Sequence, residues 1–145
     1  MNYLLGVDVG TSSVKASLIS TDGKSCFSKT EKFTYYYEDH NKMMDADSFC
    51  ETCFSVMKQL TDCVFDEDHV LSVCISGAGR NPLFVKEGKA ISPIISWQNV
   101  FDETITEQIL SDVSAEEVYQ SVGWPKFNFF PCLTTDNNCV KIILK

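Results

Sequence analysis

Along the first third of the chain, hydrophobic and polar residues alternate in the manner of β-strands. Residues 3–10 are mostly apolar, and residues 13–20 place their apolar side chains on one face and their polar side chains on the other. A period of two is typical of a strand with one buried face. The pair Asp22-Gly23 is a strong hairpin signal, and a further β-compatible segment covers residues 26–37. These segments predict three consecutive antiparallel strands.

The period changes in the next part of the chain. Between residues 48 and 64, apolar residues recur every three or four positions, which predicts a helix. Ser48 and Glu51 have the spacing of a capping box at its start. The short apolar run over residues 69–77 ends in small residues, and it predicts a buried strand that follows a crossover helix.

The remaining pattern predicts a hairpin and two helical segments. Two short strands are expected on either side of the turn Glu87-Gly88, and helices are expected over residues 101–111 and 115–122. The order β-β-β-α-β, followed by a hairpin and helices, predicts an α/β domain with a mixed sheet and not a doubly wound parallel sheet. The start and end of the second helix are marked by a capping box, Ser114 and Glu117, and by Gly123.

The composition is that of an ordinary globular protein with an acidic surface. The 145 residues include 20 acidic and 12 basic side chains, which gives a formal charge of −8. Such a surface repels phosphate backbones and anionic membranes, so neither a nucleic acid nor a membrane is expected as a partner. No apolar run approaches the roughly 18 residues of a membrane span, and no basic region precedes the first strand. These features predict a cytoplasmic protein.

The seven cysteines are irregularly spaced and odd in number, which favours reduced thiols over a disulfide framework. Cys50 and Cys53 form the one tight pair, but no second pair lies at zinc-ligand spacing. Both fall on the apolar stripe of the predicted helix. They are therefore expected to be buried as small hydrophobic residues.

The segment LLGVDVGTSSVK, residues 4–15, carries the most informative chemistry. A predicted strand ends in an aspartate and a glycine, and hydroxyl side chains and a lysine follow. This turn is either an ordinary polar hairpin or a phosphate-binding turn. The second interpretation rests on the ability of consecutive backbone N–H groups in a turn to bind anions. A carboxylate beside such a cradle holds Mg²⁺, usually through water. The candidate phosphate-binding residues are Gly10, Thr11, Ser12, Ser13 and Lys15, and Asp8 is the candidate metal ligand.

Three stretches of the chain resemble the FGGY carbohydrate kinases, within the actin/hexokinase/Hsp70 ATPase superfamily. YLLGVDVGTSSVKASLIS resembles their amino-terminal phosphate-binding motif, and VCISGAGRNPLFVKEGKAISPIISWQN resembles their next block. SVGWP stands where the family has its TG-x-P turn. The resemblance implies a ribonuclease H-like fold and a kinase that transfers the γ-phosphate of ATP, with Mg²⁺, to a sugar or polyol. It places Asp8 near Mg²⁺ and the transferring phosphate.

The sugar side departs from the family pattern. Where many members have Gly-Gln-x-His-Gly, this chain has Gly-Ala-Gly-Arg-Asn, so that Arg80 replaces the histidine. Where members have Trp-x-Asp-x-Arg, Trp97 matches, Asn99 replaces the aspartate and Phe101 replaces the arginine. By resemblance, Arg80, Trp97 and Asn99 are the candidate sugar contacts. The departures leave the particular sugar unidentified.

The catalytic base of the family lies in a second, ATP-binding domain, and no position here matches it. Residues 1–145 are therefore expected to be an incomplete N-terminal kinase domain that is inactive alone. Two other functions remain open. One is a non-catalytic binding or assembly module that forms homo-oligomers through exposed apolar surface. The other is a ribonuclease H-like nuclease, which the acidic charge and the lack of a matched acidic cluster disfavour.

Overall fold

The computed structural model describes residues 1–99 and 114–123. The chain divides into two units. The first comprises Met1–Tyr36, Met43–Gly79 and Leu83–Ile94, and the second comprises Tyr37–Lys42, Arg80–Pro82 and Ile95–Lys145. The predicted helix over residues 101–111 lies outside the described residues.

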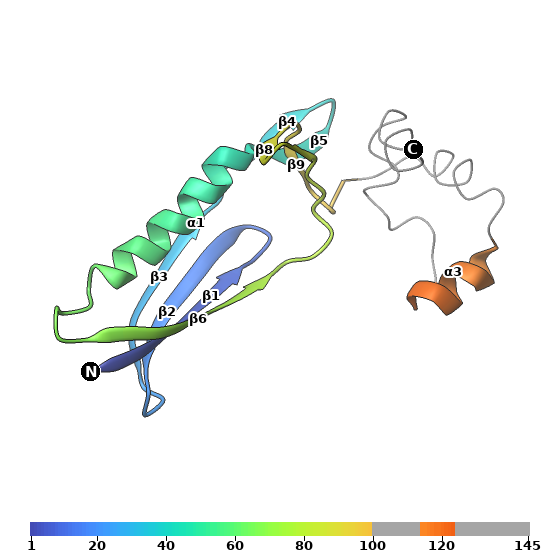
Figure 1. Ribbon diagram of the computed structural model, residues 1–145. Coiled ribbons are helices and arrows are strands. Elements are labelled where there is room, and N and C mark those ends of the chain that lie inside the picture. The colour runs from blue at the N-terminus through green and yellow to red at the C-terminus, as the bar shows by residue number, and fades with distance from the viewer. Residues whose placement is uncertain (100–113, 124–145) are drawn as a thin grey trace. The chain divides into compact units, whose positions relative to one another are not determined.

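A four-stranded mixed sheet forms the centre of the first unit (Figure 1). Its strands are β1 (Asn2–Val9), β2 (Ser13–Ser20), β3 (Ser25–Lys32) and β6 (His69–Gly77), in the order β3-β2-β1-β6. β1 and β2 are antiparallel, as are β2 and β3, whereas β6 is parallel to β1. The parallel pairing requires a crossover connection, which the helix α1 provides. The predicted order β-β-β-α-β is confirmed.

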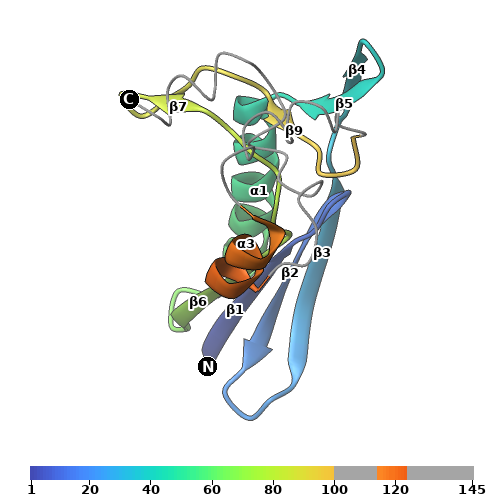
Figure 2. The ribbon, with the colours of Figure 1, turned by 90° about the vertical axis from the view of Figure 1, so that its right-hand side faces the viewer.

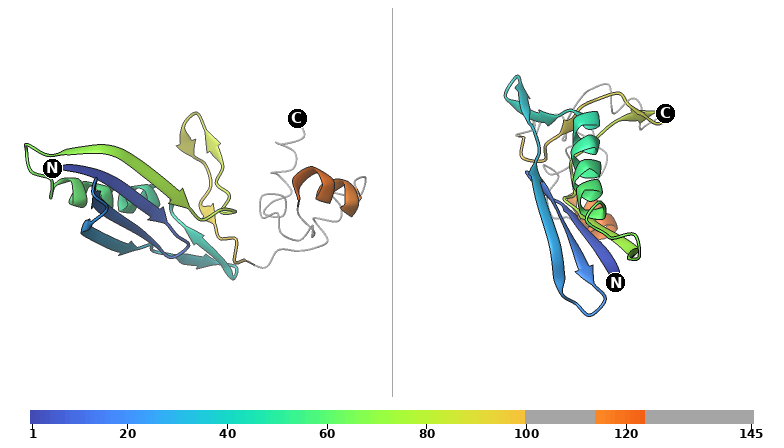
Figure 3. Two further views of the ribbon diagram at one scale, coloured as in Figure 1. Left: turned by 90° about the horizontal axis from the view of Figure 1, so that it is seen from below. Right: turned by 90° about the vertical axis from the view of Figure 1, so that its left-hand side faces the viewer.

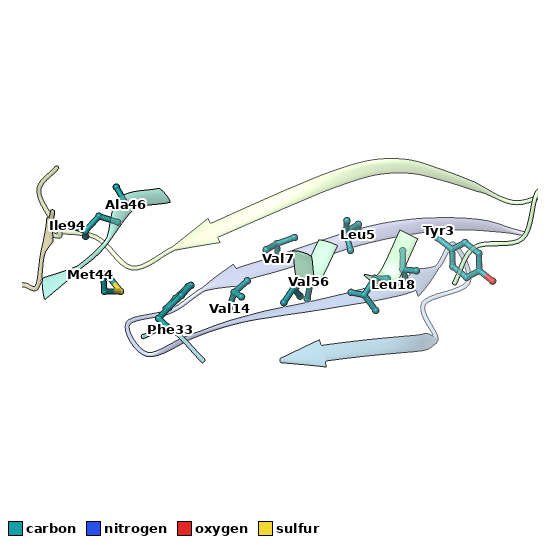
Figure 4. Packing of buried hydrophobic residues seen from close by; sticks show 12 residues of the cluster. Tyr3, Leu5, Val7, Val14, Leu18, Phe33, Met44, Ala46, Val56 and Ile94 are labelled. Atoms are coloured by element: carbon teal, nitrogen blue, oxygen red, sulfur yellow. The ribbon is translucent and has the colours of Figure 1, made fainter. Parts of the chain in front are cut away.

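The core lies between this sheet and α1, as Figure 4 shows. Alternate residues of β1 and β2 point toward the helix, and Val14 and Leu18 have no exposed surface. From α1, Val56 and Leu60 complete the contact. The alternation of apolar and polar residues along β1 and β2 therefore determines which face of the sheet is buried. The remaining members of the sheet's buried face are Tyr3, Leu5, Val7 and Ala16.

The helix α1 covers Ala46–Thr61 and lies along one face of the sheet (Figures 2 and 3). The predicted capping box of Ser48 and Glu51 is wrong. The N-cap is Asp45, whose side chain accepts a hydrogen bond from the backbone N–H of Ser48 at 2.8 Å. The helix therefore begins and ends earlier than the predicted range of 48–64, because Asp45, three residues upstream of Ser48, caps it.

We expect Asp45→Ala to lower the free energy of unfolding by about 1 kcal/mol, because it removes the only side chain bonded to this N–H among the described contacts. Urea unfolding followed by circular dichroism measures the change. Asp47→Ala, in the first turn of the same helix, serves as the matched control, and its effect is expected to be smaller. Equal losses for the two variants would show that the cap has no special role.

The predicted strand over residues 26–37 is divided in two. β3 ends at Lys32, and a separate strand β4 covers Tyr36–Glu38. At Phe33 the backbone N–H donates to the carbonyl of Ser12 at 3.0 Å, and the side chain is buried. A pattern of alternation alone does not predict this division of the segment.

After β4 the chain reverses and forms a second, smaller sheet. β4 pairs with β5 (Asn41–Met44), and β5 pairs with β9 (Ile94–Ile95). Asp39 and His40, between β4 and β5, have φ values of 45° and 69°. Positive φ at both central residues is the conformation of a type I′ hairpin turn.

The expectation that residues 69–77 form a buried strand is wrong in one respect. The strand is present, but nearly all of β6 is exposed, including Val73 and Ile75. β6 is the last strand of its sheet, and among the described residues none pairs with its outer side. Its apolar composition is that of a central strand, whereas its position is that of an edge strand.

The remaining predicted elements that are described are confirmed. β7 (Val85–Lys86) and β8 (Lys89–Ala90) form the hairpin around Glu87-Gly88. The helix α3 covers Ala115–Val122 and has the predicted capping box and a left-handed Gly123 at its end. Among the described helices, none combines the length and the apolar character that crossing a bilayer requires.

The cysteines of the described residues are free thiols, as predicted. However, Cys50 is exposed and Cys53 is only half-buried, so the expectation that both are buried is wrong. The two lie three positions apart on α1, at the margin of the face that contacts the sheet. Partial burial raises the pKa of the Cys53 thiol, and the neighbouring Cys50 adds to this effect.

We expect Cys50 to react with iodoacetamide faster than Cys53 at pH 8, because the thiolate is the nucleophile and a raised pKa lowers its fraction. Tandem mass spectrometry of the peptide that contains both residues gives the two rates. In the Cys50→Ser variant, Cys53 is expected to react with iodoacetamide more slowly than Cys63, which is another exposed thiol. Equal rates for Cys50 and Cys53 would contradict the expectation.

Candidate phosphate and sugar sites

The turn between β1 and β2 is tight and is closed by a backbone hydrogen bond. The N–H of Gly10 donates to the carbonyl oxygen of Ser13 at 3.0 Å. A Cβ atom at position 10 would lie 3.3 Å from that same oxygen, closer than side chains normally approach. Glycine is therefore the residue that the turn accommodates without a shift of its backbone. The predicted phosphate-binding residues Thr11 and Ser12 lie at its tip.

Asp8 is exposed one residue before the end of β1, between two polar neighbours. Lys15 of β2 is its cross-strand partner, and Ser76 of β6 is its partner on the other side. Directly paired residues point to the same face of a sheet. The three side chains therefore lie together on the face opposite α1, at the end of the sheet where the turn begins. The structure brings together the predicted metal ligand and the predicted lysine.

The end of β6 lies beside this turn. The N–H of Ala78 donates to the carbonyl of Val9 at 2.8 Å, and Gly77 is paired with the same residue. Two loops that are far apart in the sequence, the β1–β2 turn and the small-residue segment after β6, therefore meet at one end of the sheet. This is the end at which parallel strands place their carboxyl termini, where ligands bind in open α/β sheets.

The predicted sugar contacts belong to the second unit. Arg80 is exposed and has a φ of 71°, an uncommon conformation for a residue with a side chain. The next residue, Asn81, accepts a hydrogen bond from the backbone N–H of Trp97 at 3.0 Å. Pro82 accepts one from Ile95 at 3.0 Å. These bonds join the segment that carries Arg80 to the segment that carries Trp97, whose side chain is 37% exposed.

Asn99 uses both polar atoms of its side chain to hold a neighbouring strand. Its Oδ1 accepts from the backbone N–H of Lys42 at 2.8 Å, and its Nδ2 donates to the carbonyl of the same residue at 3.1 Å. The structure thus gives Asn99 a clear scaffolding role, and a sugar contact from it stays a prediction. The Nζ of Lys42 donates to Oε1 of Gln98 at 3.0 Å, which brings a cation to the same segment.

Sequence reasoning missed Ser76, Asn81 and Lys42. Ser76 and Asn81 lie inside the second stretch that resembles the family, but only the strand register and the hydrogen bonds show what they adjoin. Lys42 lies in β5, in a polar segment without any motif. Its place beside Asn99 depends on a contact across more than fifty residues, which no local pattern reports.

The residues around Asp8 fit a magnesium ion that a nucleotide brings with it. Among the described residues, no group of three or more histidine, cysteine or acidic side chains is gathered. A cage made only of protein ligands is therefore not present in the described part of the chain. Mg²⁺ keeps several waters and is usually bound by one or two carboxylates together with substrate phosphates. Asp8 beside the phosphate-type turn fits this arrangement.

The fold, a mixed sheet with a crossover helix, matches the fold of solved sugar kinases. Glycerol kinase of Plasmodium falciparum, solved with ADP, matches 98% of this chain and 30% of its own, with a TM-score of 0.79 and 16% identity. Gluconate kinase of Lactobacillus acidophilus matches 90% of this chain and 26% of its own, with a TM-score of 0.73 and 17% identity.

The sequence then gives the family. Residues 3–135 match the N-terminal domain of the FGGY family of carbohydrate kinases, and the chain belongs to this family. A curated relative, the gluconokinase of Bacillus subtilis (strain 168), is 26% identical over 128 residues, which cover 86% of this chain and 24% of the relative. The chain thus spans about a quarter of the length of the relatives described here.

Proposed function

We propose that this chain is the N-terminal lobe of an ATP-dependent carbohydrate kinase, which grips the terminal phosphates of Mg·ATP at the β1–β2 turn. The observation that carries the proposal is the position of Asp8. This residue is exposed near the end of β1, two residues before Gly10, and it is paired with Lys15 on one side and with Ser76 on the other. In phosphoryl transfer, positioning and neutralisation of charge dominate catalysis. A carboxylate for the cation, a lysine and the hydroxyl side chains of the turn are proposed to supply these functions.

The acceptor is proposed to be a sugar, a sugar acid or a polyol, bound near Arg80, Trp97 and Asn99. The relatives named above are kinases of gluconate and glycerol, so these compounds are the first to test. Trp97 offers an exposed aromatic face, and Arg80 offers a charged donor in the same unit. Because the chain spans about a quarter of its relatives and no aspartate matches the family base, we propose that it does not turn over alone.

Isothermal titration calorimetry with ATP, with and without Mg²⁺, tests the nucleotide part of the proposal. The expected result is weak binding that requires Mg²⁺ and that adenosine, which lacks phosphates, does not reproduce. A site for terminal phosphates would be contradicted if adenosine bound with the same heat as ATP, or if Mg²⁺ did not change the heat of ATP binding. A coupled assay with gluconate, xylulose and glycerol tests the second part, and no turnover by the chain alone is expected.

A second candidate function is a binding module that acts by association and not by transfer. The specific observation in its favour is the exposure of Leu71, Val73 and Ile75 along β6. Indifference to nucleotide in the same titration, together with oligomers whose mass increases with concentration, would favour this function over the kinase lobe.

We also propose a cytoplasmic location. The free thiols among the described cysteines are compatible with a reducing compartment, where disulfides are rare. Fractionation of cells that express the chain with an epitope tag tests this directly, and recovery in the membrane or secreted fraction would contradict it.

A further inference from the structure

The last residue of β3, Lys32, lies at the same end of the sheet as the β1–β2 turn. The register pairs Lys32 with Ser13, the first residue of β2. The next residue, Phe33, donates its backbone N–H to the carbonyl of Ser12 at 3.0 Å, and its buried ring lies beside the turn (Figure 4). Contacts on two consecutive residues therefore hold the end of β3 against the segment with the candidate phosphate-binding residues.

The side chain of Lys32 lies on the face of the sheet that also carries Asp8 and Lys15. Directly paired residues point to the same face, and side chains alternate between the faces along each strand. Since Ser13 and Lys15 are two residues apart on β2, Lys32 shares their face, which is opposite α1. Lys15 and Lys32 are diagonal neighbours across β2 and β3. Such neighbours lie about 7–8 Å apart, within reach of long side chains.

The charged side chains of this face are gathered at one end. Among the paired residues of β1, β2, β3 and β6, the face opposite α1 carries three acidic, lysine or arginine side chains, which are Asp8, Lys15 and Lys32. Each lies within two residues of the strand end at the β1–β2 turn. Farther from the turn, this face carries uncharged residues such as Ser17 and Ser28, whose hydroxyl oxygens are 2.8 Å apart. Charge on this face is therefore concentrated beside the turn.

We propose that Lys32, together with Lys15, binds the terminal phosphates of the nucleotide. This inference rests on the proposed function, because it assigns a further residue to the same nucleotide site. Asp8 and Lys15 carry opposite charges, so this pair alone offers no net attraction to a polyphosphate. Lys32 leaves this end of the face with a net positive charge. In a chain of formal charge −8, a local excess of cations favours binding of an anion at this place.

The chemistry expected of Lys32 differs from that of Asp8. An ammonium group donates hydrogen bonds to phosphate oxygens and does not bind a metal cation. Lys32 is therefore expected to strengthen ATP binding with or without Mg²⁺, and to have no effect on adenosine, which carries no phosphate. A lysine on an edge strand also discourages pairing with another chain. Lys29 serves that role as well, but it is paired with Ala16 and lies on the face toward α1.

Calorimetric titration of the full chain with ATP, with and without Mg²⁺, tests the assignment. Lys32→Gln is expected to weaken ATP binding about tenfold, the loss expected for one hydrogen bond to a charged group. Lys29→Gln is the matched control. It removes the same charge from the same strand but from the opposite face, and it is expected to leave binding unchanged. Lys32→Arg keeps the charge and should retain most of the affinity. Circular dichroism confirms that each variant is folded.

Two further measurements separate a phosphate contact from a purely structural role. The affinity for ATP should fall less steeply with added NaCl in Lys32→Gln than in the unmodified chain, because one fewer cation meets the phosphates. Acetylation of the lysines with an amine-reactive ester, followed by mass spectrometry, should show that Mg·ATP protects Lys32 and Lys15. Lys29 should react at the same rate with and without Mg·ATP.

The outcomes distinguish this inference from the proposed function. If the unmodified chain binds ATP through its phosphates, but Lys32→Gln and Lys29→Gln bind it equally well, Lys32 is not part of the site and the proposed function stands. Acetylation of Lys32 that Mg·ATP does not slow would likewise overturn this assignment alone. If the unmodified chain binds no ATP, or binds adenosine as tightly, the proposed function fails and the assignment of Lys32 fails with it.

Discussion

Replacing Asp8 with asparagine is expected to remove the magnesium dependence of ATP binding. The substitution keeps the shape of the side chain and an oxygen that accepts hydrogen bonds, and it removes the charge that a divalent cation requires. Interactions with a charged group are worth about 1.5–3 kcal/mol, so affinity for Mg·ATP should fall roughly tenfold to a hundredfold. Calorimetric titration with and without Mg²⁺ measures both the affinity and the dependence.

The fold should survive this change because Asp8 is exposed and lies on the face opposite the core. Asp62→Asn is the matched control. Asp62 is another exposed carboxylate, which pairs with Lys58 at the end of α1, and its loss should leave nucleotide binding unchanged. If Asp8→Asn and Asp62→Asn bind Mg·ATP as the unmodified chain does, Asp8 is not the residue that holds the cation.

Replacing Leu18 with alanine is expected to destabilise the fold more than any substitution at the candidate sites. Leu18 has no exposed surface and packs in the layer between β2 and α1 (Figure 4). Removing most of a buried leucine side chain loses its transfer free energy and leaves a cavity, which together cost about 3 kcal/mol. Urea denaturation followed by circular dichroism measures the loss as a lower midpoint at an unchanged slope.

Ile19→Ala is the natural comparison for Leu18→Ala. Ile19 is the next residue of β2, points to the opposite face and is only partly buried. Its truncation should cost about 1 kcal/mol, mostly through lost β-propensity and partial burial. Similar losses at the two positions would mean that α1 does not protect the face of β2 that the structure assigns to the core.

The sequence was most informative where structure is set by neighbours along the chain. The alternation of β2, the Asp22-Gly23 turn and the capping box of α3 are local features, and each was predicted correctly. The start of α1 was missed because Ser48 and Glu51 imitate a capping box while Asp45 makes the bond. Two overlapping cap signals cannot be ranked without the backbone conformation.

Burial at the edge of the sheet and the surroundings of the site depend on contacts that are distant in sequence. β6 has the composition of a central strand, yet its exposure is decided by what pairs with its outer side. Likewise, the candidate phosphate-binding residues of the β1–β2 turn were predicted from their order in the sequence, but only the strand register places Ser76 beside Asp8. The proposed roles of Arg80, Trp97 and Asn99 in sugar binding stay predictions, because the described contacts of Trp97 and Asn99 are hydrogen bonds that hold neighbouring segments of the chain.

The parallel pairing of β1 with β6 also has a consequence for the order of folding. Asn2 pairs with His69, so the central strand gains its second neighbour only after a connection of more than sixty residues has closed. Closing long connections is slow compared with forming hairpins. The β1–β2–β3 meander, which pairs Asp8 with Lys15, is therefore expected to form first, and Ser76 joins them only when the crossover helix has docked and β6 has paired with β1.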